Sequence, residues 1–144
     1  MMHSTLIRAL LATGAGAMLL STPLAARERL TGEAQLSKML EGRVAGKPVD
    51  CIDLHDATNT TIIDKTAIVY SNGNRVIYVN RPQNSDSLDD DDILVTKTWG
   101  SQLCRMDIVN LHERSGGFYS GFVGLNSFVP YTLPPKAKAP KPVS

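Results

Sequence analysis

Two runs of β-branched and aromatic residues around an Asn-Gly pair constrain the fold of this 144-residue chain more than any other feature. The runs are Thr66–Ser71 and Arg75–Asn80, with Asn72-Gly73 between them. Such residues favour strands, and Asn-Gly favours the positive φ angles of a two-residue type I′ turn. Both strands carry apolar residues on both faces, so we expect them to be central and covered on both sides. The predicted pairs are Val69–Val76, Ile68–Ile77 and Tyr70–Arg75.

Other segments have the same strand-like composition and are separated by glycine-rich turns. Cys104, Met106 and Ile108 alternate with Arg105, Asp107 and Val109, so Cys104 is expected to face inward. The pattern predicts an α+β fold, mainly β, with an antiparallel sheet or a small, partly closed barrel of five to seven strands. The further predicted strands are Val49–Leu54, Ile93–Trp99, Leu103–Leu111, Phe118–Phe122 and Ser127–Tyr131.

A short helix is predicted within Arg27–Pro48. An apolar face has the i, i+3, i+4, i+7 spacing of one helical side, and Thr31 before Gly32-Glu33 is suited to cap the N-terminus. Gly42 and Gly46-Lys47-Pro48 are suited to end the helix. The helix is therefore expected to pack against the sheet. The residues of its predicted face are Leu36, Met39, Leu40 and Arg43.

The first 26 residues have the order of a secretory signal peptide. Arg8 precedes the apolar run Ala9–Leu20, and small residues follow, as before a cleavage site. The run is shorter than the roughly 20 residues of a membrane span, so we expect cleavage and no transmembrane segment afterwards. Residues 27–133 then form one globular domain. Residues 134–144, rich in Pro, Lys and Ala, are expected to be a disordered tail.

Export determines how the two cysteines are interpreted. In an oxidising compartment, Cys51 and Cys104 are most simply a disulfide, because no C-x-x-C redox motif is present. The expected location is therefore periplasmic or secreted.

Charge excludes one class of partner. Removal of residues 1–26 takes away one base, Arg8, and leaves 14 basic and 14 acidic side chains. A chain without net charge lacks the electrostatic attraction of a nucleic-acid binder.

Candidate catalytic groups are few. The G-x-S-x-G, H-E-x-x-H, G-x-x-x-x-G-K-[ST] and G-x-G-x-x-G motifs are absent from the sequence. A small hydrolase-type enzyme would have to use Asp53, His55 or His112 with Asp107 as acid–base groups near Arg81. That alternative requires these side chains to meet in one cleft.

The acidic segment suggests a second alternative, a calcium site. Clustered carboxylates are suited to Ca²⁺, although the order of an EF-hand is missing. A solvated loop is the simpler interpretation, because neighbouring carboxylates repel one another. Otherwise no cofactor is expected. The carboxylates are Asp86, Asp89, Asp90, Asp91 and Asp92.

Aromatic residues near a base suggest a ligand-binding hollow. Trp99 is the only tryptophan, Tyr131 ends the last predicted strand, and Arg81 directly follows the predicted strand that ends at Asn80. A binding module would place them at an apolar concavity, or would offer a free sheet edge to a partner strand.

Residues 49–131 resemble a family of small exported proteobacterial proteins of unknown function. The resemblance implies a periplasmic domain with a paired cysteine, and no activity accompanies it. Family members have an acidic residue just before Phe-Val-Pro-Tyr, where this chain has Asn126-Ser127. The matching segments are Cys51-Ile52, Ile62–Tyr70, Ile77–Pro82, Asp92–Val95, Gly100–Cys104 with Asp107, Gly121–Leu125 and Phe128–Tyr131.

The expected function is a non-catalytic binding or envelope-associated module. No nucleophile, base and orienting group occur at a recognisable spacing, whereas the turns, the alternation and the cysteines all serve folding. The expected partner is an envelope protein or a small ligand.

Overall fold

The computed structural model describes residues 29–73 and 75–135. These residues form a mainly β structure with one α-helix, antiparallel sheets and one disulfide. The predicted signal peptide lies outside the described residues, as does most of the predicted tail.

The largest sheet has the strand order β1-β10-β5-β4-β3. Its strands are β1 (Val44–Ala45), β3 (Asn59–Ile63), β4 (Ala67–Ser71), β5 (Val76–Asn80) and β10 (Phe128–Thr132). Beside it lie the pair β2 (Cys51–Asp53) with β7 (Gln102–Cys104), and the sheet β6-β8-β9. The strands of that third sheet are β6 (Asp92–Thr96), β8 (Ile108–Glu113) and β9 (Tyr119–Gly124). The sheets are not closed into a barrel, and the ten strands of the described residues exceed the predicted five to seven.

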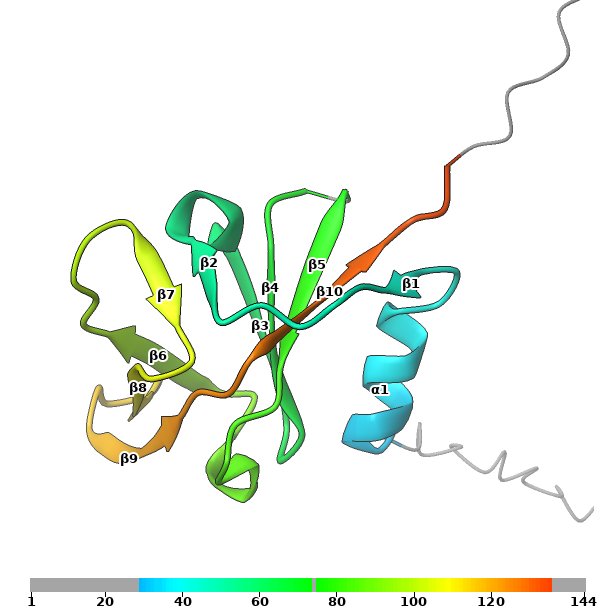
Figure 1. The fold of residues 1–144 in the computed structure, drawn as a ribbon. Coiled ribbons are helices and arrows are strands. Elements are labelled where there is room, and N and C mark those ends of the chain that lie inside the picture. The colour runs from blue at the N-terminus through cyan, green and yellow to red at the C-terminus, as the bar shows by residue number, and fades with distance from the viewer. Residues whose placement is uncertain (1–28, 74, 136–144) are drawn as a thin grey trace, which may run out of the picture.

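The helix α1 (Gly32–Met39) covers one face of the five-stranded sheet, and the other sheets cover the opposite face (Figure 1). The Thr31 hydroxyl accepts a hydrogen bond from the N–H of Ala34 at 3.4 Å, which confirms the predicted N-cap. Leu36 is buried and Met39 and Leu40 pack beside it, so the predicted apolar side does contact the sheet. The helix ends earlier than its predicted zone, because the chain turns into β1.

Two apolar clusters confirm that β4 and β5 are covered on both faces. The helix-side core contains Leu36, Ile63, Ala67, Val69, Ile77 and Val79. The sheet-side core contains Ile52, Ile68, Tyr70, Leu88, Leu103, Val109, Leu111, Val123, Leu125 and Phe128.

The predicted hairpin register is wrong by three residues. Val69 pairs with Val79, Tyr70 with Tyr78 and Ile68 with Asn80. Gly73 does have a positive φ, 72°, but the loop between the paired residues Ser71 and Ile77 is longer than two residues. This register puts Ile77 and Val79 on the side of Val69, under the helix. Burial on both faces therefore decides the pairing, and the turn accommodates it.

The predicted strand Leu103–Leu111 is also wrong, because a turn divides it into β7 and β8. The carboxylate of Asp107 accepts the N–H of Cys104 at 2.7 Å, and the N–H of Asp107 donates to the carbonyl of Cys104 at 2.9 Å. Met106 and Ile108 are exposed in consequence, and Val109 and Leu111 are buried in their place.

The disulfide Cys51–Cys104 is confirmed, and it joins directly opposite residues of β2 and β7. No helix in the described part of the chain is long and apolar enough to cross a membrane.

Candidate functional site

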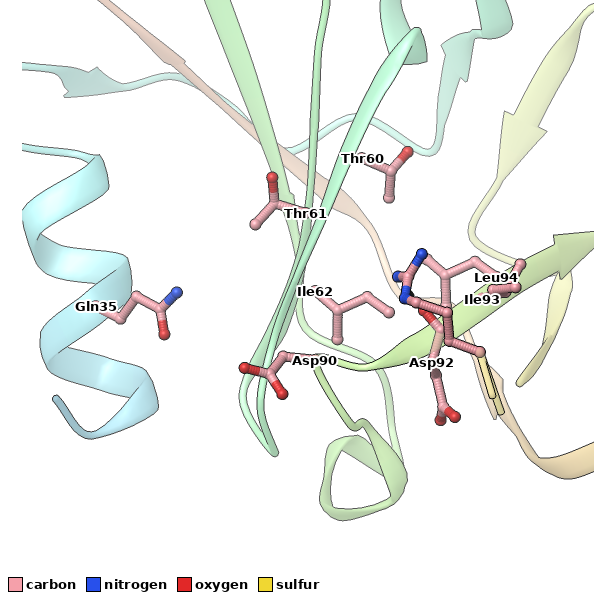
Figure 2. A pocket seen from close by; sticks show the side chains of 9 residues that line it. Gln35, Thr60, Thr61, Ile62, Asp90, Asp92, Ile93 and Leu94 are labelled. Carbon is pink, nitrogen blue, oxygen red and sulfur yellow. Dashed lines mark hydrogen bonds between the residues drawn. The ribbon is translucent and has the colours of Figure 1, made fainter. Parts of the chain in front are cut away.

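A cleft of about 500 Å³ lies between α1, β3 and β6 (Figure 2). Its walls come from four separate parts of the chain, which only the fold brings together. The residues that line it are Gln35, Thr60, Thr61, Ile62, Asp90, Asp92, Ile93, Leu94 and Arg114.

Strand β3 presents a free edge to this cleft. Within the described residues, β3 pairs only with β4, and β6 pairs only with β8. The outer strands of two different sheets therefore line the same cleft. A free strand edge is a row of N–H and C=O groups that can pair with another chain.

The outward backbone groups of β3 belong to Thr60 and Ile62. The carbonyl of Ile63 accepts the N–H of Thr66 across the turn to β4, so Ile63 directs its backbone groups toward β4. Successive residues of a strand direct these groups to opposite edges, which turns those of Thr60 and Ile62 toward the cleft. The side chain of Ile62 packs against the sheet-side core, the side chain of Thr60 is exposed, and the side chain of Thr61 lies on the α1 side (Figure 2).

The acidic segment Asp86–Asp92 forms the rim of the cleft, with an apolar anchor inside it and an anchoring amide just before it. Leu88, within this segment, is 1% exposed and belongs to the sheet-side core. The Asn84 amide donates to the carbonyl of Phe122 at 2.6 Å and accepts from the N–H of Gly124 at 3.2 Å. Asp86, Asp89, Asp90 and Asp91 are exposed, in agreement with a solvated loop, whereas Leu88 and Asp92 are buried.

The carboxylates of this segment have separate partners. Asp90 is 3.4 Å from the Arg29 guanidinium, and Asp91 is 3.4 Å from that of Arg114. Asp92 is 6% exposed and accepts a hydrogen bond from the Ser120 hydroxyl at 3.1 Å.

The other two carboxylates, Asp86 and Asp89, do not complete a metal-binding cluster. Asp89 accepts the N–H of Asp91 at 2.9 Å, and Asp86 lies in the short 3₁₀ helix Ser85–Ser87. In the part of the chain that the structure describes, no group of three or more His, Cys, Asp or Glu residues could hold a metal ion.

Arg81 and Tyr131 do come together, in a separate hollow of about 280 Å³. The Arg81 guanidinium makes two hydrogen bonds to the Glu33 carboxylate, at 2.5 and 2.9 Å, which lower the pKa of Glu33. Arg81 therefore ties α1 to β5. Trp99 lies elsewhere, 90% exposed, with the Lys97 ammonium 5.9 Å from its ring.

The candidate acid–base groups have different neighbours. The ring of His55 contacts the Asn72 amide at 3.3 Å, and the ring of His112 contacts the carbonyl of Gly117 at 3.0 Å. The carboxylates of Asp53 and Asp107 accept backbone N–H groups. Among residues 29–73 and 75–135, no hydrogen bond or ion pair joins either histidine to a carboxylate.

The sequence-based prediction missed β3, Gln35 and Arg114 as parts of a site. The run Thr60–Ile63 is β-branched throughout, which is a strand signal. Nothing local shows that this strand is an edge, because that depends on the order of strands in the finished sheet.

Comparisons with protein-family models, curated proteins and solved structures found no match to this chain.

Proposed function

We propose that this protein is a non-catalytic binding module whose cleft takes up an extended polypeptide segment, paired as an added strand with the free edge of β3. One observation carries the proposal: the outward edge of β3 lines a cleft of about 500 Å³ instead of being covered.

Strand addition is suited to this site because it needs backbone groups first and side-chain pockets second. β3 has five residues, so its edge extends over about 17 Å. An added strand would direct alternate side chains toward α1 and toward β6. Gln35 lies on the first side, and Ile93 and Leu94 lie on the second.

The polar residues at the rim of the cleft favour a peptide over an apolar small molecule. Asp90, Asp92 and Arg114 line the cleft beside the threonines of β3. The exposed side chains of Asp90 and Arg114 can pair with charged and polar residues of a bound segment, while the main affinity comes from hydrogen bonds along β3.

The proposed setting is an extracytoplasmic, oxidising compartment, periplasmic or secreted. The disulfide Cys51–Cys104 is of the kind that persists where thiols are not kept reduced. The signal-peptide pattern of residues 1–26 agrees with it. The proposed partner is therefore an extended segment of an envelope protein.

The test is a selection of random heptapeptides, displayed on phage, against the disulfide-bonded protein. Selected peptides are then synthesised and titrated by fluorescence anisotropy. Thr60→Pro removes the outward N–H of β3 and leaves the ladder to β4 intact, since proline is tolerated on strand edges. We expect at least a tenfold loss of affinity.

The matched control is Thr60→Val, which keeps the backbone N–H and a β-branched side chain. It should bind the same peptides within about threefold of the unchanged protein, and thermal melts should show both variants folded. Equal binding by Thr60→Pro, or a selection that yields no peptide, would overturn the proposal.

A further inference from the structure

The sheet β6-β8-β9 has one face in the core and one face in solvent. Leu94, Val109, Leu111 and Val123 form the inner side, against the sheet-side core. The opposite side chains alternate with them along β6 and β8 and at Phe122 and Gly124 of β9. A β-bulge opposite Leu111 and His112 brings Tyr119 to the same side, where its ring contacts that of His112. We call this set the outer face: Ile93, Val95, Ile108, Asn110, His112, Tyr119, Phe122 and Gly124.

The outer face is apolar although it is exposed. Ile108 is 55% exposed, Tyr119 60% and Phe122 51%. None of its eight residues is Asp, Glu, Lys or Arg. Contiguous apolar surface of this kind on a soluble domain marks an interaction site.

The residues of the outer face are arranged in rows across the sheet. Val95, Asn110 and Phe122 form the middle row, because Asn110 pairs with both. Ile93, His112 and Tyr119 form one flanking row, with the two rings in an edge contact at 5.8 Å. Ile108 and Gly124 form the second flanking row, on the opposite side of the middle row. Asn110 therefore lies at the centre of the face.

We propose that the outer face is the interface of a symmetric homodimer, with the two-fold axis close to Asn110. The occupant of the face is a second copy of this chain, packed sheet on sheet.

The size of the face agrees with a dimer interface. With about 150–250 Å² for a whole aromatic side chain, the exposed fractions of its five large apolar residues give roughly 500 Å². Two copies of such a face would bury about 1,000 Å² in total, which reaches the lower size limit of a specific, weakly associating interface.

The chemistry of the face suits a second copy. A two-fold axis brings each residue near its own counterpart, so a charged face would repel itself, and this face has no charge. At the centre, the amide of Asn110 offers both a donor and an acceptor, which allows it to pair with the same amide of the other copy. Two sheet faces stack about 10 Å apart, with their strands nearly aligned.

The dimer does not depend on peptide binding by β3, since only Ile93 belongs to both surfaces. The two proposals can therefore fail separately.

The test is sedimentation equilibrium of the disulfide-bonded protein, from about 1 µM to 500 µM. We expect a dimer in the upper part of this range. Asn110→Asp and Asn110→Lys each place like charges together at the axis, so each should weaken dimerisation at least tenfold. An equimolar mixture of the two variants should dimerise again, because the charges are then opposite.

The control is Val44→Lys, a change at an exposed valine on β1, which should leave the dimer unchanged. Unchanged protein that stays monomeric at 500 µM would overturn the proposal. So would undiminished dimerisation of either Asn110 variant, or a mixture that stays monomeric. Monomeric protein that co-sediments with phosphatidylethanolamine–phosphatidylglycerol vesicles would indicate a membrane as the occupant instead.

Discussion

Asn80 is fully buried, yet both polar atoms of its side chain have a partner on Asn126. Its amide oxygen accepts the N–H of Asn126 at 3.2 Å, and its amide nitrogen donates to the carbonyl of the same residue. The Asn126 side chain in turn donates to the carbonyl of Arg81 at 2.7 Å. Asn126 therefore tethers the start of β10 to β5 as an uncharged amide.

Tyr70 is the opposite case, because its buried hydroxyl has no hydrogen-bond partner among the described residues. A desolvated hydroxyl without a partner costs free energy, so Tyr70→Phe should raise the free energy of unfolding by about 1 kcal/mol. Burial also raises the pKa of Tyr70. The folded state thus keeps a proton that the unfolded state releases above a pH of about 10. Above that pH, deprotonation stabilises the unfolded chain. The free energy of unfolding of the unchanged protein therefore has its full Tyr70 contribution below about pH 10 and falls as the pH rises further.

The gain from Tyr70→Phe should consequently be larger at pH 10.5 than at pH 7, as measured by urea denaturation. Tyr119→Phe, at a tyrosine that is 60% exposed, is the control and should change little. A destabilised Tyr70→Phe would contradict the prediction by showing that the hydroxyl has a partner in solution.

At the scale of elements, the turn at Asp107 decides where β7 ends and β8 begins. Its carboxylate accepts the N–H of Cys104 and so stabilises the reversal. Asp107→Ala leaves that N–H without its partner and should lower the free energy of unfolding by about 1–2 kcal/mol. Asp107→Asn keeps an acceptor oxygen and should lose less than half as much in the same urea titration. Equal losses in both variants would contradict the assignment to this hydrogen bond.

The helix and most strands could be predicted because their signals are local. Thr31 caps α1, and the β-branched run of β4 forms a strand whatever its partner. Register could not be predicted, since it depends on which face of β5 lies under α1. The turn at Asp107 that separates β7 from β8 was also missed. The residues Leu103–Leu111 alternate like one continuous strand, and this pattern does not reveal that the Asp107 carboxylate accepts the backbone N–H of Cys104.

The cleft is harder to predict because no single segment contains it. Gln35, Thr60, Ile93 and Arg114 meet only after β3 has become an edge strand and Leu88 has anchored the acidic rim. Strand order is a property of the assembled sheet. The sequence alone therefore drew attention to the aspartates, whereas the free edge beside them is the more informative feature.

At the scale of the whole molecule, the sheet-side core joins all three sheets. Ile52 and Leu103 come from the β2–β7 pair, Tyr70 and Phe128 from the five-stranded sheet, and Val109 from the β6-β8-β9 sheet. The β2–β7 pair has only three residues on each strand. A two-stranded element of this length is marginal by itself, so its position in the core relies on another constraint.

The disulfide Cys51–Cys104 supplies that constraint. It closes a loop across 53 positions, and in the chain-entropy view such a loop disfavours the unfolded state by about 4 kcal/mol. The double variant Cys51→Ala/Cys104→Ala should lose about 2–5 kcal/mol in urea denaturation, and reduction of the unchanged protein should cost a similar amount. Reductant should have no effect on the double variant, which controls for other actions of the thiol reagent. The loss should also be accompanied by faster amide hydrogen exchange in β2 and β7 than in β4 and β5, because the short pair is the element that the disulfide holds. An unchanged urea midpoint after complete reduction would show that the apolar side chains of Ile52 and Leu103 hold β2 and β7 in the core without the covalent link.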